Sequence, residues 1–379
     1  MGETISGRDR LIKIIGGLGV DRAPIAPFIH ANFVKAFFRD QDVDVVTQTV
    51  AVYEAFGFDI IHRNCTPAYD DIGIPGSGWE VERTVACCGR DRTTTTVVHT
   101  PKGDLREVHR LAWVSDYDAE ATPVEYLIKS EGDLDLMIAF QPSVATMDTS
   151  PIVLAAEALG DRGLTAPWVQ GAFNHVAFYY RPLDQLVVDA LADPPFYHRM
   201  MKYFLSRNMA IVSQLIRAGA DMLSYGGNIA SGKMVSSSFF REHVLPYEKR
   251  LINFVQSAGV PVLYHNCGYA KNLFPAYREL GMLAYESLTA LPYGDTALEE
   301  AFELLGPGMV LSGGIDQIEF LRKAGPDEVR RKVKETLDKA KGRGRFILGT
   351  SDYLHELTPH ENVAALAEAG VHYGECCVT

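Results

Sequence analysis

Two residues with metal-ligating side chains stand two positions apart in the segment Val260–Gly268, which reads Val-Pro-Val-Leu-Tyr-His-Asn-Cys-Gly. The apolar run Val260–Tyr264 predicts a short buried strand. Because side chains alternate between the faces of a strand, His265 and Cys267 would project together from its carboxyl end. Imidazole and thiolate are ligands that zinc favours. We therefore predict a metal site here; the alternative is a buried histidine and an inert buried cysteine.

These residues need a scaffold that holds strand ends together, and the surrounding sequence repeats such a pattern. Short apolar runs alternate with amphipathic segments of about 10–20 residues, which indicates βαβ units and a parallel sheet. The predicted strands are 23–29, 58–62, 166–170, 220–225, 260–265, 282–286, 309–312 and 345–349. The predicted helices are 8–20, 43–56, 194–218, 238–258, 298–305, 326–341 and 359–369, with a further helix starting at Ala270.

About eight such repeats predict a closed (β/α)8 TIM barrel that takes in residues 1–379 as a single domain. A doubly wound open sheet is the alternative, but no Gly-x-Gly-x-x-Gly or Walker phosphate loop follows any of the strands. Residues 79–115 differ, with alternating and β-branched runs and the turn Thr100–Asp104. We predict that they form an antiparallel β-hairpin insertion, because they are too few to build a core of their own.

In a barrel of this kind, functional groups gather at the carboxyl ends of the strands and in the loops that follow. Polar and ligand-type residues occupy those positions throughout the second half of the sequence. They are Asn174, His175, Tyr225, Asn228, His265, Cys267, Glu286, Asp316, Asp352 and His355. Their clustering strengthens the prediction that His265 and Cys267 bind a metal.

The composition excludes several classes of partner. With 36 Lys plus Arg against 48 Asp plus Glu, the chain carries a formal charge of −12, which disfavours nucleic acid and anionic membranes. It contains no run of about 18 apolar residues and no signal-peptide pattern at its start. Four of its six cysteines form the adjacent pairs Cys87–Cys88 and Cys376–Cys377, unlike a disulfide scaffold. We expect a reduced, cytoplasmic enzyme.

From Pro167 to the end of the chain, the order of several short motifs resembles the uroporphyrinogen decarboxylase superfamily. The motifs are Ala-Pro-Trp at 166–168, Leu-Ala-Asp-Pro at 191–194, Gly-Ala-Asp-Met-Leu at 219–223, Phe-Phe-Arg-Glu-His-Val-Leu-Pro-Tyr at 239–247, Val-Leu-Tyr-His-Asn-Cys-Gly at 262–268, Leu-Ser-Gly-Gly-Ile-Asp at 311–316 and Leu-Thr-Pro-His-Glu-Asn-Val at 357–363. Each piece is short, but their order and spacing together are specific. The resemblance implies a TIM barrel.

Two branches of that superfamily differ in their chemistry. The decarboxylases carry an arginine-rich segment after the first strand, whose guanidinium groups suit the carboxylates of a tetrapyrrole. The corresponding segment here, 27–37, contains no arginine. The cobalamin-dependent methyltransferases instead carry His-x-Cys, which matches His265 and Cys267, and bind zinc. The resemblance thus implies zinc, together with a cobalamin (corrinoid) carried on a partner protein, because the cobalt-ligating motif Asp-x-His-x-x-Gly is absent here.

The third zinc ligand departs from the family pattern. Thiol-methylating members carry a cysteine just before a Pro-x-Glu-Asn segment, but residues 349–355, which precede Pro359–Asn362, contain none. A carboxylate in its place would leave the zinc more Lewis acidic, which suits cleavage of a methyl ether. The predicted metal ligands are His265, Cys267, Glu286 and Asp352, with His355 as an alternative third ligand, and the predicted catalytic residues are Asp352 and His355.

Four polar residues at other strand ends are predicted to contact the substrate: Asn174, Tyr225, Asn228 and Asp316. Two glycines precede Asn228, and glycine backbone allows a ligand to approach closely. Two glycines also precede Asp316, which could equally cap the helix that begins near Gln317.

The resemblance and these departures predict a zinc-dependent methyltransferase. It would move a methyl group between a small O-methyl substrate, with a methoxylated aromatic favoured, and the cobalt of a corrinoid protein. Three alternatives stay open: methyl transfer from the corrinoid to a thiol such as coenzyme M, decarboxylation, and a non-catalytic binding barrel. The sequence does not fix the substrate, the direction of transfer or whether the chain forms a homodimer.

Overall fold

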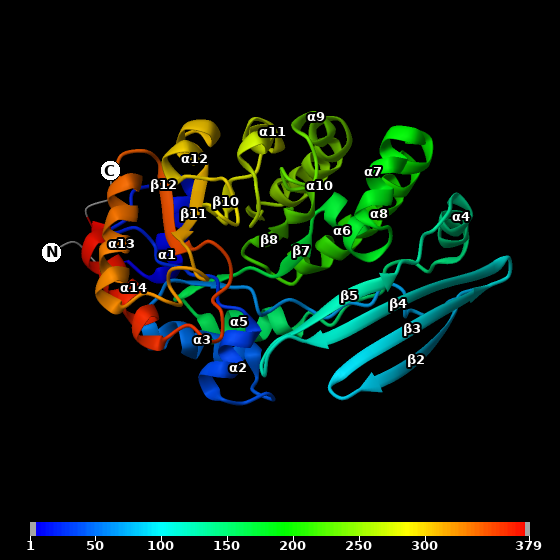
Figure 1. Cartoon of the computed structure of the whole chain (residues 1–379), viewed down its shortest axis with the longest axis horizontal. Coiled ribbons are helices and arrows are strands. Elements are labelled where there is room, and N and C mark those ends of the chain that lie inside the picture. Colours follow the sequence, from blue (N-terminus) through cyan, green and yellow to red (C-terminus); the bar gives the residue numbers. More distant parts are fainter. Residues whose placement is uncertain (1–4, 376–379) are drawn as a thin grey trace.

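A ring of short parallel strands forms the centre of the fold in the computed structural model, which describes residues 5–375 (Figure 1). One sheet has the order β7-β8-β9-β10-β11-β12, and β1 pairs with β6. The strands are β1 (Ile60–His62), β6 (Gly163–Thr165), β7 (Trp168–Gln170), β8 (Leu223–Gly226), β9 (Val262–His265), β10 (Ala284–Glu286), β11 (Val310–Ile315) and β12 (Arg345–Thr350).

Backbone contacts close the ring between these two sheets. Ile25 forms a parallel bridge with Leu348 of β12, and its carbonyl accepts a hydrogen bond of 2.9 Å from the N–H of Asp59. On the other side of β1, the N–H of Ala166 donates to the carbonyl of His62 at 2.9 Å. Two residues separate β6 from β7, so these are consecutive parts of one barrel strand. The ring confirms the predicted (β/α)8 barrel.

Apolar side chains fill both sides of the ring, which explains why its strands have nearly continuous apolar sequences. One buried cluster takes a residue from most strands and fills the inside of the barrel: Ala26, Ile61, Leu164, Leu263, Ala284, Val310 and Ile347. A larger cluster packs the outer faces of the strands against the helices. Every residue of β8, β9 and β10 is buried, so the polar groups at their ends stand on a rigid base.

Helices form the outer layer and follow the strands in alternation. They are α1 (Gly7–Gly16), α2 (Ala31–Phe38), α3 (Val45–Phe56), α4 (Glu131–Phe140), α5 (Ser150–Leu159), α6 (Ala172–Tyr179), α7 (Leu183–Ala192), α8 (Pro194–Arg217), α9 (Ser237–Phe239), α10 (Leu245–Ser257), α11 (Phe274–Leu280), α12 (Leu298–Leu305), α13 (Pro326–Ala340) and α14 (His360–Gly374). The helix predicted at 238–258 is divided, because a π-helical turn at Phe240–Val244 separates α9 from α10.

An antiparallel sheet of four strands lies beside the barrel, at the lower right of Figure 1. Its strands, in spatial order, are β2 (Glu80–Cys88), β3 (Asp91–Thr100), β4 (Gly103–Trp113) and β5 (Ala119–Glu125). The insertion predicted at 79–115 is therefore part of a larger sheet. The sequence of β5 does not indicate a strand, because it contains charged residues and Pro123. Proline has no N–H to donate to the backbone hydrogen bonds of a sheet.

Of the two adjacent cysteine pairs, one lies within the described residues. Cys87 and Cys88 are free and exposed at the end of β2. Cys376 and Cys377 lie outside the described residues. Within residues 5–375, none of the helices has the length and apolarity needed to cross a bilayer.

Candidate metal centre and its cavity

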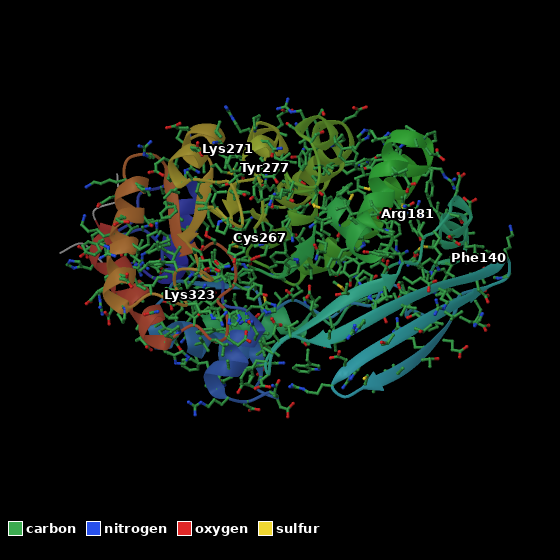
Figure 2. All side chains as sticks on the ribbon, in the orientation of Figure 1. Phe140, Arg181, Cys267, Lys271, Tyr277 and Lys323 are labelled. Carbon is green, nitrogen blue, oxygen red and sulfur yellow. The ribbon has the colours of Figure 1, made fainter. Side chains whose placement is uncertain are left out.

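Three potential metal ligands meet at the carboxyl ends of β9 and β12. One ligand atom from each of His265, Cys267 and Asp352 lies within 4.8 Å of the others. His265 ends β9, Cys267 follows two residues later, and Asp352 comes two residues after β12. The closed ring brings these distant strand ends together, and Cys267 is labelled near the centre of the molecule in Figure 2. The predicted pairing of His265 with Cys267 is thus present in the structure.

Behind this cluster, a second layer of polar groups orients the imidazole of His265. Its Nδ1 lies 3.1 Å from Oε1 of Glu286 and 3.0 Å from Oγ of Ser287. Its Nε2 lies 3.8 Å from Oδ1 of Asp352, on the side of the cluster. Nδ1 therefore faces the supporting residues, and Nε2 faces the possible metal ligands. The same arrangement occurs in metal sites where a carboxylate orients a ligating histidine.

The electrostatics of this site favour a cation. Burial opposes a charge on the imidazole, yet Cys267, Glu286 and Asp352 together raise the pKa of His265 well above its ordinary value. Burial would likewise raise the pKa of Glu286, but Arg63 and His265 hold it below the usual value of a glutamate. The groups around the imidazole thus stabilise positive charge, which a metal ion can supply as well as a proton.

Two of the predicted site residues lie outside the cluster. Glu286 forms an ion pair with Arg63 and contacts Nδ1 of His265, so its carboxylate supports the histidine and does not join the three possible ligands. His355 accepts a hydrogen bond of 3.1 Å from the N–H of Leu357 through Nδ1. Asp352, and not Glu286 or His355, is thus the third residue of the group around His265 and Cys267.

A cavity of about 360 Å³ opens beside the cluster, and its walls are rich in aromatic rings. The rings of Phe28 and Trp168 are stacked with centroids 6.2 Å apart, and Tyr353 meets Phe28 edge-on at 6.0 Å. Trp168 also contacts the imidazole of His265 edge-on at 5.2 Å. The group formed by His265, Cys267 and Asp352, a possible metal site called the metal cluster below, therefore faces a space that suits a planar apolar group.

Arg63 is a functional candidate that the sequence analysis missed. It follows β1 and lines the cavity, with its guanidinium carbon 4.0 Å from the ring centroid of Phe28. It pairs with Glu286, and its Nε donates to Oγ of Ser224 at 3.0 Å. Its buried Nη1, however, has no hydrogen-bond partner among the described residues. The signal in the sequence was its place, directly after a short buried strand.

The four predicted substrate-binding residues have different surroundings. Asn228 lines the cavity and accepts a hydrogen bond of 3.0 Å from Nδ2 of Asn174, which lies behind it. Tyr225 is fully buried and donates its hydroxyl to Glu248. Asp316 accepts from the backbone N–H groups of residues 318 and 319, at 2.8 Å and 2.7 Å, as a capping residue does. Of the four, only Asn228 borders the cavity.

Comparison with known proteins agrees with this architecture. A sequence profile described as "Uroporphyrinogen decarboxylase (URO-D)" matches residues 164–373, more than half of the chain. The chain belongs to the uroporphyrinogen decarboxylase family. The matched region contains the strand ends that carry His265, Cys267 and Asp352, whereas Arg63 and Phe28 lie before it.

Proteins to which the chain is similar carry two kinds of name. The chain is 27% identical to a uroporphyrinogen decarboxylase from Syntrophotalea carbinolica, over 53% of this chain and 54% of the relative. It is 21% identical to a methylcobamide:CoM methyltransferase, MtbA, from Methanosarcina acetivorans, over 44% of this chain and 46% of the relative. The chain thus spans about half the length of these curated relatives. A solved methyltransferase structure from Methanosarcina mazei covers 97% of this chain and 99% of its own, with a TM-score of 0.71 and 15% identity, which shows a shared fold.

Proposed function

We propose that this chain is a corrinoid-dependent methyltransferase that takes the methyl group from a small methoxylated aromatic molecule. The observation that carries the proposal is the position of a Cys–His–Asp cluster beside a cavity with aromatic walls. The similarity to a named methylcobamide methyltransferase supports the class of reaction. The corrinoid would arrive on a partner protein and receive the methyl group.

His265, Cys267 and Asp352 fit zinc, because nitrogen, sulfur and oxygen donors of these types are its usual ligands. Zinc bound there supplies a Lewis acid for the ether oxygen of the methyl donor. Glu286 accepts the Nδ1 proton of His265 and so directs Nε2 towards the other two ligands. The three ligands leave further coordination positions for the substrate.

Arg63 supplies a second positive group at the same cavity. When the methyl group leaves, its former oxygen gains negative charge, and a preorganised donor stabilises that charge. The unpaired Nη1 of Arg63 is such a donor, and the ion pair with Glu286 together with the contact to Ser224 holds it in place. A buried donor without a partner costs free energy, so an oxygen-bearing substrate gains by satisfying it.

The size and lining of the cavity favour one aromatic ring over a tetrapyrrole. A volume of about 360 Å³ lies at the lower end of the range for small-molecule sites. Phe28, Trp168 and Tyr353 line the cavity and supply aromatic surface for contacts with such a ring. A tetrapyrrole with several carboxylates needs several cationic partners, whereas Arg63 is the only arginine or lysine that lines this cavity in the described chain.

A methyl-transfer assay tests the proposal. Zinc-loaded protein is mixed with chemically reduced cob(I)alamin, and methylcobalamin formation is followed by absorbance with methoxylated phenols and benzoates, methylated amines and methylated thiols as donors. We expect methylcobalamin to form with the methoxylated aromatics. The rate should fall by more than about 100-fold in Cys267→Ser, because a residue that binds the metal directly contributes more than the residues that orient it. Cys87→Ser, an exposed cysteine on β2, is the matched control. Failure of every methoxylated aromatic with metal-loaded protein would remove the proposal.

Transfer of a methyl group to coenzyme M is the second candidate, favoured by the similarity to the named methylcobamide:CoM methyltransferase. The same assay in reverse, with methylcobalamin and coenzyme M, separates the two. Thiol-dependent loss of methylcobalamin without any arene demethylation would replace the first proposal by this one. A folded protein that binds no zinc would instead favour a decarboxylase or a binding protein.

A further inference from the structure

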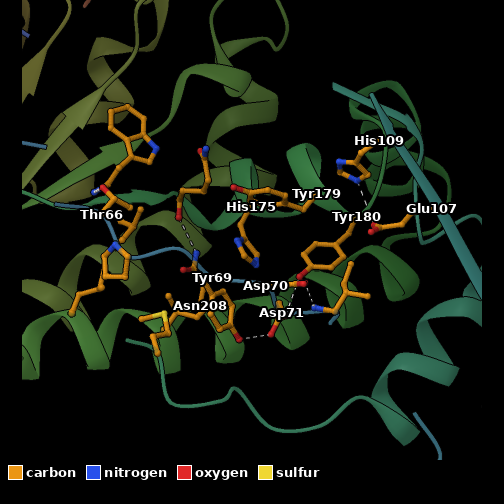
Figure 3. A pocket seen from close by; sticks show the side chains of 18 residues that line it. Thr66, Tyr69, Asp70, Asp71, Glu107, His109, His175, Tyr179, Tyr180 and Asn208 are labelled. Atoms are coloured by element: carbon orange, nitrogen blue, oxygen red, sulfur yellow. Dashed lines mark hydrogen bonds and ion pairs between the residues drawn. The ribbon is translucent and has the colours of Figure 1, made fainter. Parts of the chain in front are cut away.

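A second cavity, of about 320 Å³, lies between the barrel and the antiparallel sheet (Figure 3). Its walls come from the segment after β1, from β4, from β7 and from helices α6 and α8. It shares two wall residues, Thr66 and Trp168, with the cavity beside the metal cluster. The N–H of Trp168 donates to Oγ1 of Thr66 at 2.7 Å, and this hydrogen bond links the two residues that separate the cavities.

A rigid network of polar groups forms one side of this second cavity. Asp71 accepts hydrogen bonds from the hydroxyls of Tyr69 at 2.5 Å and Tyr180 at 2.9 Å, and from Nε of Arg207 at 2.8 Å. Tyr180 in turn stacks on Phe204 with ring centroids 3.9 Å apart. All of the hydrogen-bonding capacity of Asp71 is thus used within the protein, so it holds the aromatic walls in place.

Four polar atoms in the lining are buried without a hydrogen-bond partner among the described residues. Oε2 of Glu107 and Nε2 of His109 face each other at 3.4 Å, whereas Nε2 of His175 and Oε1 of Gln170 have no such neighbour. Figure 3 shows the imidazole of His175 in the middle of the lining side chains, between Tyr180 and Asn208. His175 is 7% exposed, and burial lowers its pKa to about 4, so the ring is neutral at pH 7. Buried polar atoms without partners are rare in proteins, and a ligand that pairs with them explains their presence.

The charges around the cavity define the class of ligand. Asp71 pairs with Arg207, Asp70 with Arg83, and Glu107 lies 3.4 Å from Nε2 of His109. The described lining contains no arginine or lysine that could bind an anion. A hydroxyl group can both donate and accept, so it fits a neutral imidazole and an amide oxygen better than a carboxylate or an ammonium group does.

We propose that this second cavity binds an uncharged ring that carries hydroxyl groups, with His175 and Gln170 as its hydrogen-bonding partners and tyrosine faces as its walls. The cavity adjoins the metal cluster across Trp168. The proposed binding does not rest on the proposed function.

Saturation-transfer NMR with a small set of ring probes tests this site. The probes are catechol and myo-inositol as hydroxylated rings, benzoate as an anion, benzylamine as a cation and toluene as an apolar ring. All measurements use the Cys267→Ser variant without metal, so that neither zinc nor methyl transfer contributes. We expect saturable binding of a hydroxylated ring, and an affinity about tenfold lower when His175→Phe is added, because one hydrogen bond is lost.

Two further variants keep the test decisive. Met234→Leu, at an exposed methionine outside the lining, should leave the affinity unchanged, whereas Ile211→Trp fills the cavity from α8 and should abolish binding. Thermal unfolding checks that each variant is folded. The proposal is overturned if benzoate, benzylamine or toluene binds as tightly as the hydroxylated rings. Absence of saturable binding, or an affinity insensitive to both His175→Phe and Ile211→Trp, also overturns it, and leaves the metal cluster and the methyltransferase proposal untouched.

Discussion

Glu286 lies directly beside His265 in the barrel, because the two residues are register partners on the parallel strands β10 and β9. Its Oε1 is 3.1 Å from Nδ1 of the imidazole, and its other oxygen pairs with Arg63. From the neighbouring strand, Glu286 reaches Nδ1 of His265 and leaves Nε2 for a metal ion. Glu286 therefore belongs to the support of the metal cluster, and its contribution can be separated from that of the ligands.

Replacing Glu286 by glutamine should weaken zinc binding about 10–100-fold, the usual effect of losing a carboxylate that orients a ligating histidine. It should also lower the free energy of unfolding by about 3 kcal/mol, because Arg63 is left as an unpaired buried charge. Competition with a chelating dye measures the first effect, and denaturant unfolding of the metal-free protein measures the second.

A double variant, Arg63→Met with Glu286→Gln, separates these two effects, since it removes the unpaired charge. It should regain most of the stability but not the zinc affinity. Glu279→Gln is the matched control, because that glutamate forms an exposed ion pair with Arg241 on the surface. Unchanged zinc affinity in Glu286→Gln would contradict the supporting role.

Asp352 and His355 should differ sharply in their importance for the metal. Asp352→Ala removes one of three possible ligands, so zinc should be lost on gel filtration in a buffer without added metal. His355→Ala removes an acceptor for the N–H of Leu357 and an imidazole near the carboxylate of Glu356, so it should keep its zinc and lose about 1 kcal/mol of stability. Elemental analysis of both variants after identical treatment gives the answer, and equal zinc content would refute the assignment of Asp352.

Much of this site could be predicted from the sequence. The strand pattern placed His265 at the end of β9, and the barrel rule brought Cys267 and Asp352, which follow their strands, to the same face. The roles of Glu286 and Arg63 could not be predicted, because they depend on strand register and on which long side chain reaches across the barrel. Strand register depends on how far neighbouring strands are shifted along one another around the closed barrel, and no local sequence pattern encodes that shift.

The surroundings of the barrel were less predictable than its strands. The long helix α8 agrees with its predicted range, 194–218, to within one residue. It was predictable because Pro194 and Pro195 mark its start and its apolar residues recur at helical spacing. The antiparallel sheet, in contrast, exposes most of β2, so burial imposes little pattern on that strand. The second cavity lies between this sheet and α8, and its walls come from segments that only the tertiary fold brings together.

Tyr225 should act on stability and not on substrate binding. Its hydroxyl donates to Glu248, a fully buried carboxyl whose pKa burial raises to about 7. Tyr225→Phe should lower the free energy of unfolding by about 2 kcal/mol, as expected for a lost hydrogen bond to a group that can carry charge. The loss should be larger at pH 8 than at pH 5, because Glu248 is ionised at the higher pH and needs the donor more.

Steady-state kinetics and denaturant unfolding check this prediction together. The KM for the methyl donor should stay unchanged in Tyr225→Phe but rise in Asn228→Ala, since Asn228 lines the metal cavity. Tyr293→Phe is the control for stability, because its hydroxyl bonds to Glu319 at the surface. A raised KM with unchanged stability in Tyr225→Phe would return this tyrosine to the list of substrate contacts.

His175 should make the protein sensitive to acid. Its pKa is about 4 in the folded protein, chiefly because of burial, against about 6.5 in the unfolded chain. The unfolded state therefore binds the proton more tightly, so the stability contributed by the neutral ring is complete above pH 6.5 and is lost as the pH falls towards 4. At about 1.4 kcal/mol per pKa unit, this loss amounts to about 3 kcal/mol.

His175→Phe should remove that part of the pH dependence, because a phenyl ring binds no proton in either state. Denaturant unfolding between pH 7 and pH 4 should accordingly show a shallower loss of stability for the variant than for the natural chain. NMR of the carbon-13-labelled histidine rings offers an independent readout, with the His175 signal identified by its absence from the variant spectrum. That signal should stay at its neutral position down to about pH 5; titration near pH 6.5 would show that the ring is solvated and would remove the basis of the prediction.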